Sequence, residues 1–277
     1  METLVQNHKV YFERSGEGPP ALFMHGVPDT ADIWQDVIAG VRDRYTCYAP
    51  DFMGIHRSAE NPAFDYSFDG YADWIEALVQ ALGIDQPVTL VVHDWGLMGL
   101  AWACKYPQRI ARIVITNTVF THLYKWHFWA RVWRTPLLGE LAMLSMNRYI
   151  FRHEMRRGSR KLTRQQIDHA YSGAFAKLSS RFVVLRMYRS ADPAKLIGWE
   201  TRFETLAQRV PVKVLWGEHD PYLPRWVSTC FYTQDVELIP GIGHWVPTEA
   251  AEWMIDGILN EPDRSNQEKD SAAISLP

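Results

Sequence analysis

The stretch Val92-His93-Asp94-Trp95-Gly96 is the most informative part of this chain. It follows the apolar, β-branched run 88–92, which predicts a buried strand, and it precedes the run 97–105, which predicts a helix. A sharp strand-to-helix turn with a small residue two places after its central residue exposes that central side chain at the edge of a sheet. The central residue is Asp94, and a carboxylate there can attack an electrophilic sp³ carbon and form an alkyl ester. The structural alternative is an acidic N-cap for the following helix.

An ester on an aspartate needs a base that activates water and an acid that orients this base. Asp220 lies in the loop after the buried run 212–217, and His244 lies in a glycine-rich loop after the short run 236–239. Ligands in open α/β sheets bind at such loops, beyond the carboxyl ends of the strands. The chain order of nucleophile, acid and histidine also fits a catalytic triad. We therefore predict Asp94 as nucleophile, Asp220 as the acid that orients the histidine, and His244 as general base.

A fourth segment, His25-Gly26-Val27-Pro28, follows the apolar run 21–24. A loop in this position can supply a backbone N–H to an oxyanion hole, and the residue after the nucleophile supplies another. We predict that the amides of Val27 and Trp95 are these donors and stabilise the oxyanion that forms when water attacks the ester. A simple tight turn at this segment is compatible with that role.

These motifs, with the loops 49–54, 216–221 and 243–245, resemble the α/β-hydrolase superfamily, in particular its haloalkane dehalogenase and epoxide hydrolase branch. The resemblance runs from about Val10 to Ile258. It implies an α/β fold, the α/β-hydrolase fold, in which a mostly parallel sheet is flanked by helices and carries an inserted helical cap. It also implies an enzyme that needs no cofactor and no metal.

The resemblance divides the chain into a core, an insertion and a tail. We expect residues 1–117 and 199–260 to form the α/β-hydrolase core, residues 118–198 the helical cap, and residues 261–277 a flexible C-terminal tail. Within the core, the sequence predicts a single strand over 4–13 and a helix over about 248–259.

The first expected function is that of a haloalkane dehalogenase, which converts a haloalkane and water into an alcohol and a halide. Candidates for holding the leaving halide are Trp95 and the cap residues Trp126 and Trp129, since an indole N–H donates a hydrogen bond that a halide can accept. Packing of these cap tryptophans onto the core is the structural alternative. Asn117 follows a buried strand, and it either lines the pocket or satisfies backbone groups.

The second expected function is that of an epoxide hydrolase with the same triad. Met187-Tyr188-Arg189 resembles the end of an epoxide hydrolase cap, where the tyrosine hydroxyl protonates the opening epoxide oxygen. Val27 also favours this function, because many dehalogenases carry at this position an asparagine that helps to hold the halide. A third, remote alternative is a binding protein of the same fold without catalytic activity.

Composition limits the partners. The 277 residues suit one large α/β domain with an insertion, and the net charge of −3 gives no reason to expect nucleic acid or an anionic membrane as a partner. Three cysteines without paired spacing suggest a reducing compartment, and the polar N-terminus lacks the apolar core of a signal peptide. We expect a cytoplasmic protein, a monomer or homodimer, that acts on a small apolar organic substrate.

Overall fold

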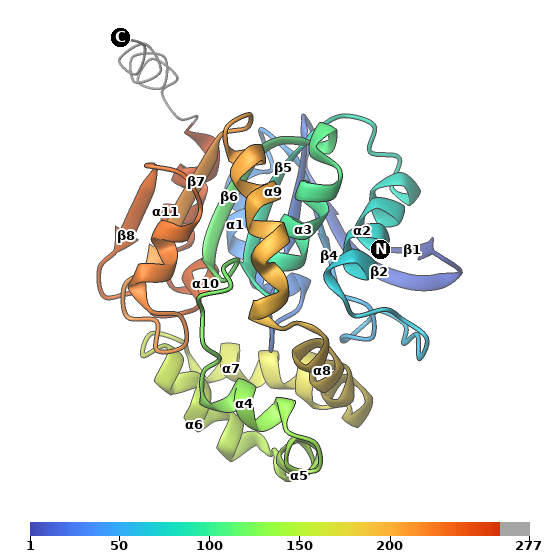
Figure 1. Cartoon of the computed structure of the whole chain (residues 1–277), viewed down its shortest axis with the longest axis vertical. Coiled ribbons are helices and arrows are strands. Elements are labelled where there is room, and N and C mark those ends of the chain that lie inside the picture. The colour runs from blue at the N-terminus through green and yellow to red at the C-terminus, as the bar shows by residue number, and fades with distance from the viewer. Residues whose placement is uncertain (261–277) are drawn as a thin grey trace.

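A computed structural model describes residues 1–260 and shows an eight-stranded sheet at the centre of the molecule (Figure 1). The strands are β1 (Glu2–Val5), β2 (His8–Ser15), β3 (Pro20–Met24), β4 (Thr46–Pro50), β5 (Val88–Asp94), β6 (Ile110–Thr118), β7 (Val212–Gly217) and β8 (Val236–Ile239). Their order in the sheet is β1-β2-β4-β3-β5-β6-β7-β8. The pairs from β4 to β8 are parallel, and β1 and β2 join them through antiparallel pairing. The expected mostly parallel sheet is therefore confirmed.

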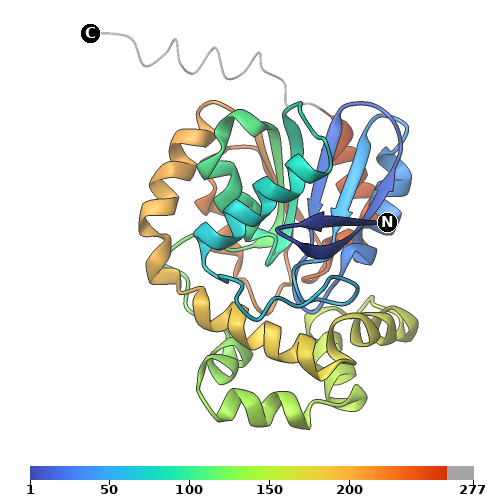
Figure 2. The same ribbon diagram turned by 90° about the vertical axis from the view of Figure 1, so that its right-hand side faces the viewer.

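Helices cover both faces of this sheet, and the two faces have separate apolar cores. One face carries α1 (Gln35–Val41), α10 (Val246–Glu249) and α11 (Ala251–Leu259), and the other carries α2 (Phe68–Ala81), α3 (Leu97–Lys105) and α9 (Ile197–Ala207) (Figure 2). The strands β3, β5, β6 and β7 are almost wholly buried, which explains why they appear in the sequence as continuous apolar runs.

The helix predicted over 97–105 is confirmed without change as α3. Two predicted elements are each divided in the structure. The single strand expected over 4–13 is an antiparallel pair, β1 and β2, because Gln6 and Asn7 take positive φ angles of 50° and 66° and turn the chain back. The helix expected over 248–259 is interrupted at Ala250, whose φ of −146° and ψ of 49° separate α10 from α11.

The segment between β6 and α9 contributes no strand to the sheet. Its helices are α4 (Phe128–Arg134), α5 (Leu138–Ser145), α6 (Arg148–Gly158), α7 (Arg164–Ala170) and α8 (Leu178–Ser190). They form a separate layer at the end of the sheet where the parallel strands terminate (Figure 1). This arrangement agrees with a cap over 118–198, although its boundaries remain a prediction, and the expected tail 261–277 lies outside the described residues.

Two expectations from the sequence concern the helices and the cysteines. Within residues 1–260, none of the helices combines the length and the apolar character that crossing a bilayer requires. Cys47, Cys104 and Cys230 are all unpaired.

Candidate active site

Asp94 occupies the turn between β5 and α3, at the centre of the sheet. Its φ of +49° lies in the left-handed region, which a residue with a β-carbon rarely adopts. Gly96 permits this sharp turn, because a β-carbon at that position would lie 2.4 Å from the Met24 carbonyl oxygen. Strained backbone of this kind is concentrated at functional sites. The strain here directs the Asp94 carboxyl group toward the cap.

The loop after β3 holds one oxygen of this carboxylate. The Val27 N–H donates a hydrogen bond to Asp94 Oδ1 over 2.7 Å. Only a glycine fits beside it, since a β-carbon at Gly26 would lie 2.5 Å from the same oxygen. The amide of Val27 thus occupies the position expected for an oxyanion-hole donor. The corresponding role of the Trp95 amide remains a prediction.

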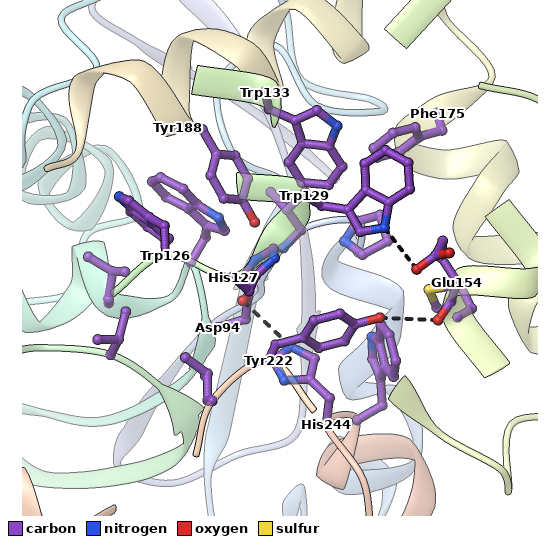
Figure 3. Close-up of a pocket in the computed structure, with 18 of the residues that line it drawn as sticks. Asp94, Trp126, His127, Trp129, Trp133, Glu154, Phe175, Tyr188, Tyr222 and His244 are labelled. Carbon is purple, nitrogen blue, oxygen red and sulfur yellow. Dashed lines mark hydrogen bonds and ion pairs between the residues drawn. The ribbon is translucent and has the colours of Figure 1, made fainter. Parts of the chain in front are cut away.

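His244 lies between the two carboxylates that the sequence singles out. Its Nδ1 is 2.6 Å from Asp220 Oδ2. Its Nε2 is 3.5 Å from Asp94 Oδ2 (Figure 3). Asp220 is itself fixed, because its Oδ1 accepts hydrogen bonds from the backbone N–H groups of Tyr222 and Leu223 at 2.7 and 3.0 Å. The three residues that we predicted as a triad therefore lie in one chain of contacts.

The carboxylates determine the charge on this histidine. Burial lowers the pKa of His244, but Asp220 and Asp94 outweigh burial and raise it to about 10. In turn, His244 and the Val27 N–H overcome the effect of burial and hold the pKa of Asp94 below its usual range. The two carboxylates thus favour the protonated form of His244, and His244 in turn favours the ionised form of Asp94. An ester on Asp94 would remove one negative charge and lower the pKa of His244, as a general base requires.

A cavity lies directly above these groups, between the core and the helical layer (Figure 3). Most of its walls are aromatic or aliphatic. The residues that line it include Asp94, Trp95, Tyr124, Trp126, His127, Trp129, Trp133, Phe151, Phe175, Tyr188, Tyr222 and His244. Such a chamber, with a few polar groups converging at one end, suits a small apolar ligand.

A family model described as the alpha/beta hydrolase fold matches residues 19–251. The chain belongs to the α/β-hydrolase family. Its relatives include a cis-3-alkyl-4-alkyloxetan-2-one decarboxylase of Shewanella oneidensis, which is 26% identical over 91% of this chain and 84% of the relative. They also include haloalkane dehalogenase 2 of Mycobacterium tuberculosis, which is 25% identical over 91% of this chain and 90% of the relative. These relatives identify the protein as an enzyme.

Solved structures show the same fold. The haloalkane dehalogenase DbeA from Bradyrhizobium elkani aligns with a TM-score of 0.79 at 22% identity, covering 93% of this chain and 95% of that one. The epoxide hydrolase CorEH aligns with a TM-score of 0.78 at 19% identity, covering 94% and 97%. Both activities occur on one architecture, so the fold alone does not identify the substrate class of this α/β-hydrolase.

The structure changes the interpretation of Asn117. Its side chain is fully buried at the end of β6, where Nδ2 donates to Asp220 Oδ2 over 2.7 Å and Oδ1 accepts from the Gly217 N–H over 2.8 Å. Both ends of the amide are thus occupied away from the cavity. The prediction that Asn117 contacts the substrate is not supported, and the residue instead holds the acid of the triad.

The tryptophans expected near the leaving group differ in the availability of their N–H groups. Trp129 Nε1 donates to Glu154 Oε2 over 2.8 Å and is therefore already engaged. Trp126 stacks on Trp95 with ring centroids 6.2 Å apart, and its buried Nε1 has no partner within residues 1–260. The Trp95 ring packs edge-on against Tyr188, with ring centroids 4.6 Å apart. Of the cap tryptophans named from the sequence, Trp126 thus keeps an available donor.

Sequence reasoning missed the polar groups His127, Glu154 and Tyr222 in the cavity wall. Glu154 accepts from Trp129, and the Tyr222 hydroxyl donates to the Glu154 carbonyl oxygen over 3.1 Å. His127 directly precedes α4 and caps it. Histidine is not among the residue types that prefer N-cap positions, so no local sequence signal indicated its place.

A second buried carboxyl group, that of Asp29, lies behind the triad. Its Oδ2 accepts a hydrogen bond from Trp245 Nε1 over 3.0 Å and lies 4.0 Å from the unpartnered Nδ1 of His93. The other ring nitrogen of His93 lies 3.0 Å from the His244 carbonyl oxygen. Burial, together with the charge of Asp94, raises the pKa of Asp29 from 3.8 to about 7.

This pKa predicts how stability depends on pH. Because the folded state holds the proton of Asp29 more tightly than the unfolded chain does, the protein loses stability as pH rises from about 4 through about 7. Asp29→Asn removes this loss and keeps an acceptor for Trp245. We expect it to raise the free energy of unfolding by roughly 2–4 kcal/mol at pH 8 and by little at pH 4, as urea denaturation would show. An equal effect at both pH values would contradict the assignment.

Proposed function

We propose that this enzyme hydrolyses small organic substrates through a covalent ester between Asp94 and an sp³ carbon. The observation that carries the proposal is the orientation of the Asp94 carboxylate. Val27 holds Oδ1 over 2.7 Å, while Oδ2 faces His244 over 3.5 Å at the floor of the cavity. One oxygen is thus fixed and the other is placed to attack.

The same geometry supports both halves of the reaction. In the first half, Asp94 Oδ2 bonds to the carbon, and the leaving group departs with its electron pair. Asp94 Oδ1 then becomes the carbonyl oxygen of the ester and keeps its hydrogen bond from Val27. In the second half, His244, after losing its own proton to solvent, takes a proton from water, which attacks the ester carbon. The bond between this carbon and the alkyl oxygen breaks, and His244 gives the proton to the departing alcohol. The proton of the new Asp94 carboxyl group then passes to His244 and restores the carboxylate. The Val27 N–H stabilises the negative charge that develops on Oδ1.

The first candidate reaction is hydrolytic dehalogenation. The chamber is predominantly apolar, which suits the alkyl part of a haloalkane, and the buried Trp126 Nε1–H finds no partner in the described part of the chain. A haloalkane dehalogenase is 25% identical to this chain along most of its length. In this reaction the halide leaves the carbon and accepts hydrogen bonds from indole N–H groups.

The second candidate is hydrolysis of a strained oxygen ring, and the contact between Trp95 and Tyr188 favours it. The Tyr188 ring packs against that of Trp95 with centroids 4.6 Å apart, and both side chains line the cavity that contains Asp94. A phenol can transfer its proton to an oxygen that leaves the carbon, which an indole cannot do. The named substrates of the relatives that fit this class are an epoxide and an oxetan-2-one.

Isotope labelling tests the ester directly. A single turnover in H₂¹⁸O, with enzyme in excess over substrate, should give a product without the heavy isotope, because its new oxygen comes from Asp94. A peptide containing Asp94 should carry the label afterwards. Direct attack of water on the substrate predicts the reverse distribution and would exclude the ester. Running the experiment with 1-bromohexane and with 1,2-epoxyhexane shows which leaving group the enzyme accepts.

A further inference from the structure

The helix α5 presents a row of leucines to the solvent. Its inner side, with Gly139 and Met143, is buried where the helix packs against α4 and α8. Four leucines on the outer side are between 49% and 78% exposed, and these are Leu137, Leu138, Leu141 and Leu144. Residues at this spacing lie on one side of a helix. We call these four residues the leucine face.

The leucine face lies at the outer end of the molecule. In Figure 1, α5 is at the bottom of the helical layer, on the side away from the sheet. Exposed apolar side chains also occur on the two helices that adjoin α5 in the chain, namely Phe128 on α4 and Tyr149 on α6. A concentration of large apolar side chains on a surface marks an interaction site, whereas single ones are ordinary.

The helical layer that carries this face is strongly basic. Residues 118–198 contain 15 lysines and arginines but only 4 aspartates and glutamates, which gives a net charge of +11. The rest of the chain carries −14, so the total of −3 conceals a very uneven distribution. The expectation that an anionic membrane is not a partner was drawn from the total charge, and it does not apply to this layer.

The acidic residues of the layer are already engaged. All four form ion pairs with arginines of the same layer, and they are Glu140, Glu154, Asp168 and Asp192. By contrast, Arg131 and Arg148 are exposed and have no ion pair within residues 1–260. Arg131 lies one turn after Phe128 on α4, and Arg148 directly precedes Tyr149 on α6. Free positive charge thus accompanies the exposed apolar side chains.

We propose that the leucine face docks on an anionic lipid bilayer, with the arginines of the helical layer at the lipid headgroups. An interfacial helix places its apolar face at the boundary between headgroups and acyl chains, and its basic neighbours attract anionic lipids. Nucleic acid would leave the leucines in water. A second copy docked by the same face would bring two layers of net charge +11 together. The inference goes beyond the proposed reaction and does not depend on an ester at Asp94.

Docking in this way would bring the bilayer close to the cavity. The helices that adjoin α5 also form the cavity wall, α4 through Trp129 and Trp133 and α6 through Phe151. The bilayer and the cavity would therefore be separated by a single layer of helices. Because apolar compounds concentrate in the acyl chains, a docked enzyme would meet an apolar substrate where that substrate accumulates.

Co-sedimentation of the full chain with sucrose-loaded vesicles tests the docking. We expect binding to phosphatidylcholine vesicles that contain phosphatidylglycerol as about a third of the lipid, and binding at least about tenfold weaker to phosphatidylcholine alone. The double variant Leu141→Ser/Leu144→Ser should weaken binding to the anionic vesicles by about 10²-fold. The double variant Arg131→Gln/Arg148→Gln should weaken it by about tenfold.

Matched variants remove the same side chains from other surfaces. Leu4→Ser/Ile197→Ser changes two exposed apolar residues on β1 and α9, and Arg42→Gln/Arg44→Gln changes two exposed arginines after α1. We expect each control to bind the anionic vesicles within about twofold of the wild type. Thermal unfolding verifies that every variant is folded.

Three results would overturn the proposal. The first is that folded wild-type protein does not bind the anionic vesicles, or binds both kinds of vesicle equally. The second is an equal loss of binding in the two leucine-type double variants, which would mean that the position of the apolar residues is irrelevant. The third is a dimer in sedimentation velocity that Leu141→Ser/Leu144→Ser abolishes, because the leucine face would then belong to a second copy of the chain.

Discussion

Asp94→Ala is expected to lower turnover by about 10⁴-fold or more, because it removes the oxygen that bonds to the substrate in the proposed mechanism. The loss should appear equally in kcat and in kcat/KM, since the other carboxylate that lines the cavity within residues 1–260, that of Glu154, is engaged by Trp129 Nε1. The single-turnover label should also disappear from the peptide that contains position 94. Product release and mass spectrometry of the same sample measure both effects.

A matched substitution keeps this result interpretable. Asp36→Ala removes an exposed carboxylate on α1, and we expect its activity to equal that of the wild type. Full activity in folded Asp94→Ala protein would contradict the mechanism outright. A partial loss of about tenfold would instead assign Asp94 an electrostatic role and direct attention to activated water as the nucleophile.

His244→Gln is expected to uncouple the two halves of the reaction. Asp94 remains ionised and can still attack, whereas the water that should cleave the ester loses its base. Turnover should fall by about 10³-fold or more, while an ester accumulates to one equivalent per protein. Intact mass spectrometry identifies this ester. A bromoalkane adds its alkyl group with loss of bromide, and an epoxide adds its whole mass.

The charge balance of the site makes this second result informative. Asp94 and Asp220 together raise the pKa of His244 to about 10, which favours a positive charge beside the proposed nucleophile. Glutamine removes this charge and also removes the base. We therefore expect the rate of ester formation to change modestly, whereas ester cleavage stops. His153→Gln, an exposed substitution on α6, is the matched control. Failure to detect an ester under steady-state conditions, with activity lost, would place His244 in the first half instead.

Much of the site follows from local sequence pattern. The nucleophile, the acid and the histidine each come directly after an apolar run, and the parallel arrangement of those runs brings the three loops to one edge of the sheet. The turn at Asp94 is similarly local, because the elbow requires a small residue at Gly96 and a helix immediately after it. Periodicity and turn chemistry act over a few residues, so the chain reveals them directly.

Other properties of the site depend on contacts between distant parts of the chain. Asn117 donates a hydrogen bond to Asp220, which lies 103 positions further along the chain. This contact makes Asn117 a support for Asp220, the predicted acid of the triad, and not a candidate ligand of the substrate. Trp129 is engaged by Glu154, whereas Trp126 has the same side chain and remains unpartnered. No local pattern distinguishes these two tryptophans.

Local sequence pattern was enough to predict the fold of this α/β-hydrolase, and it brought forward the three residues proposed as a triad and the loop at Val27. Only the tertiary structure decided which donors are available to a substrate, because availability depends on which partners the folded chain has already supplied. His127 shows the difference most clearly. A histidine before a helix is unremarkable in sequence, but its capping bond fixes the proton on Nε2 and the fold places that nitrogen in the wall of the cavity.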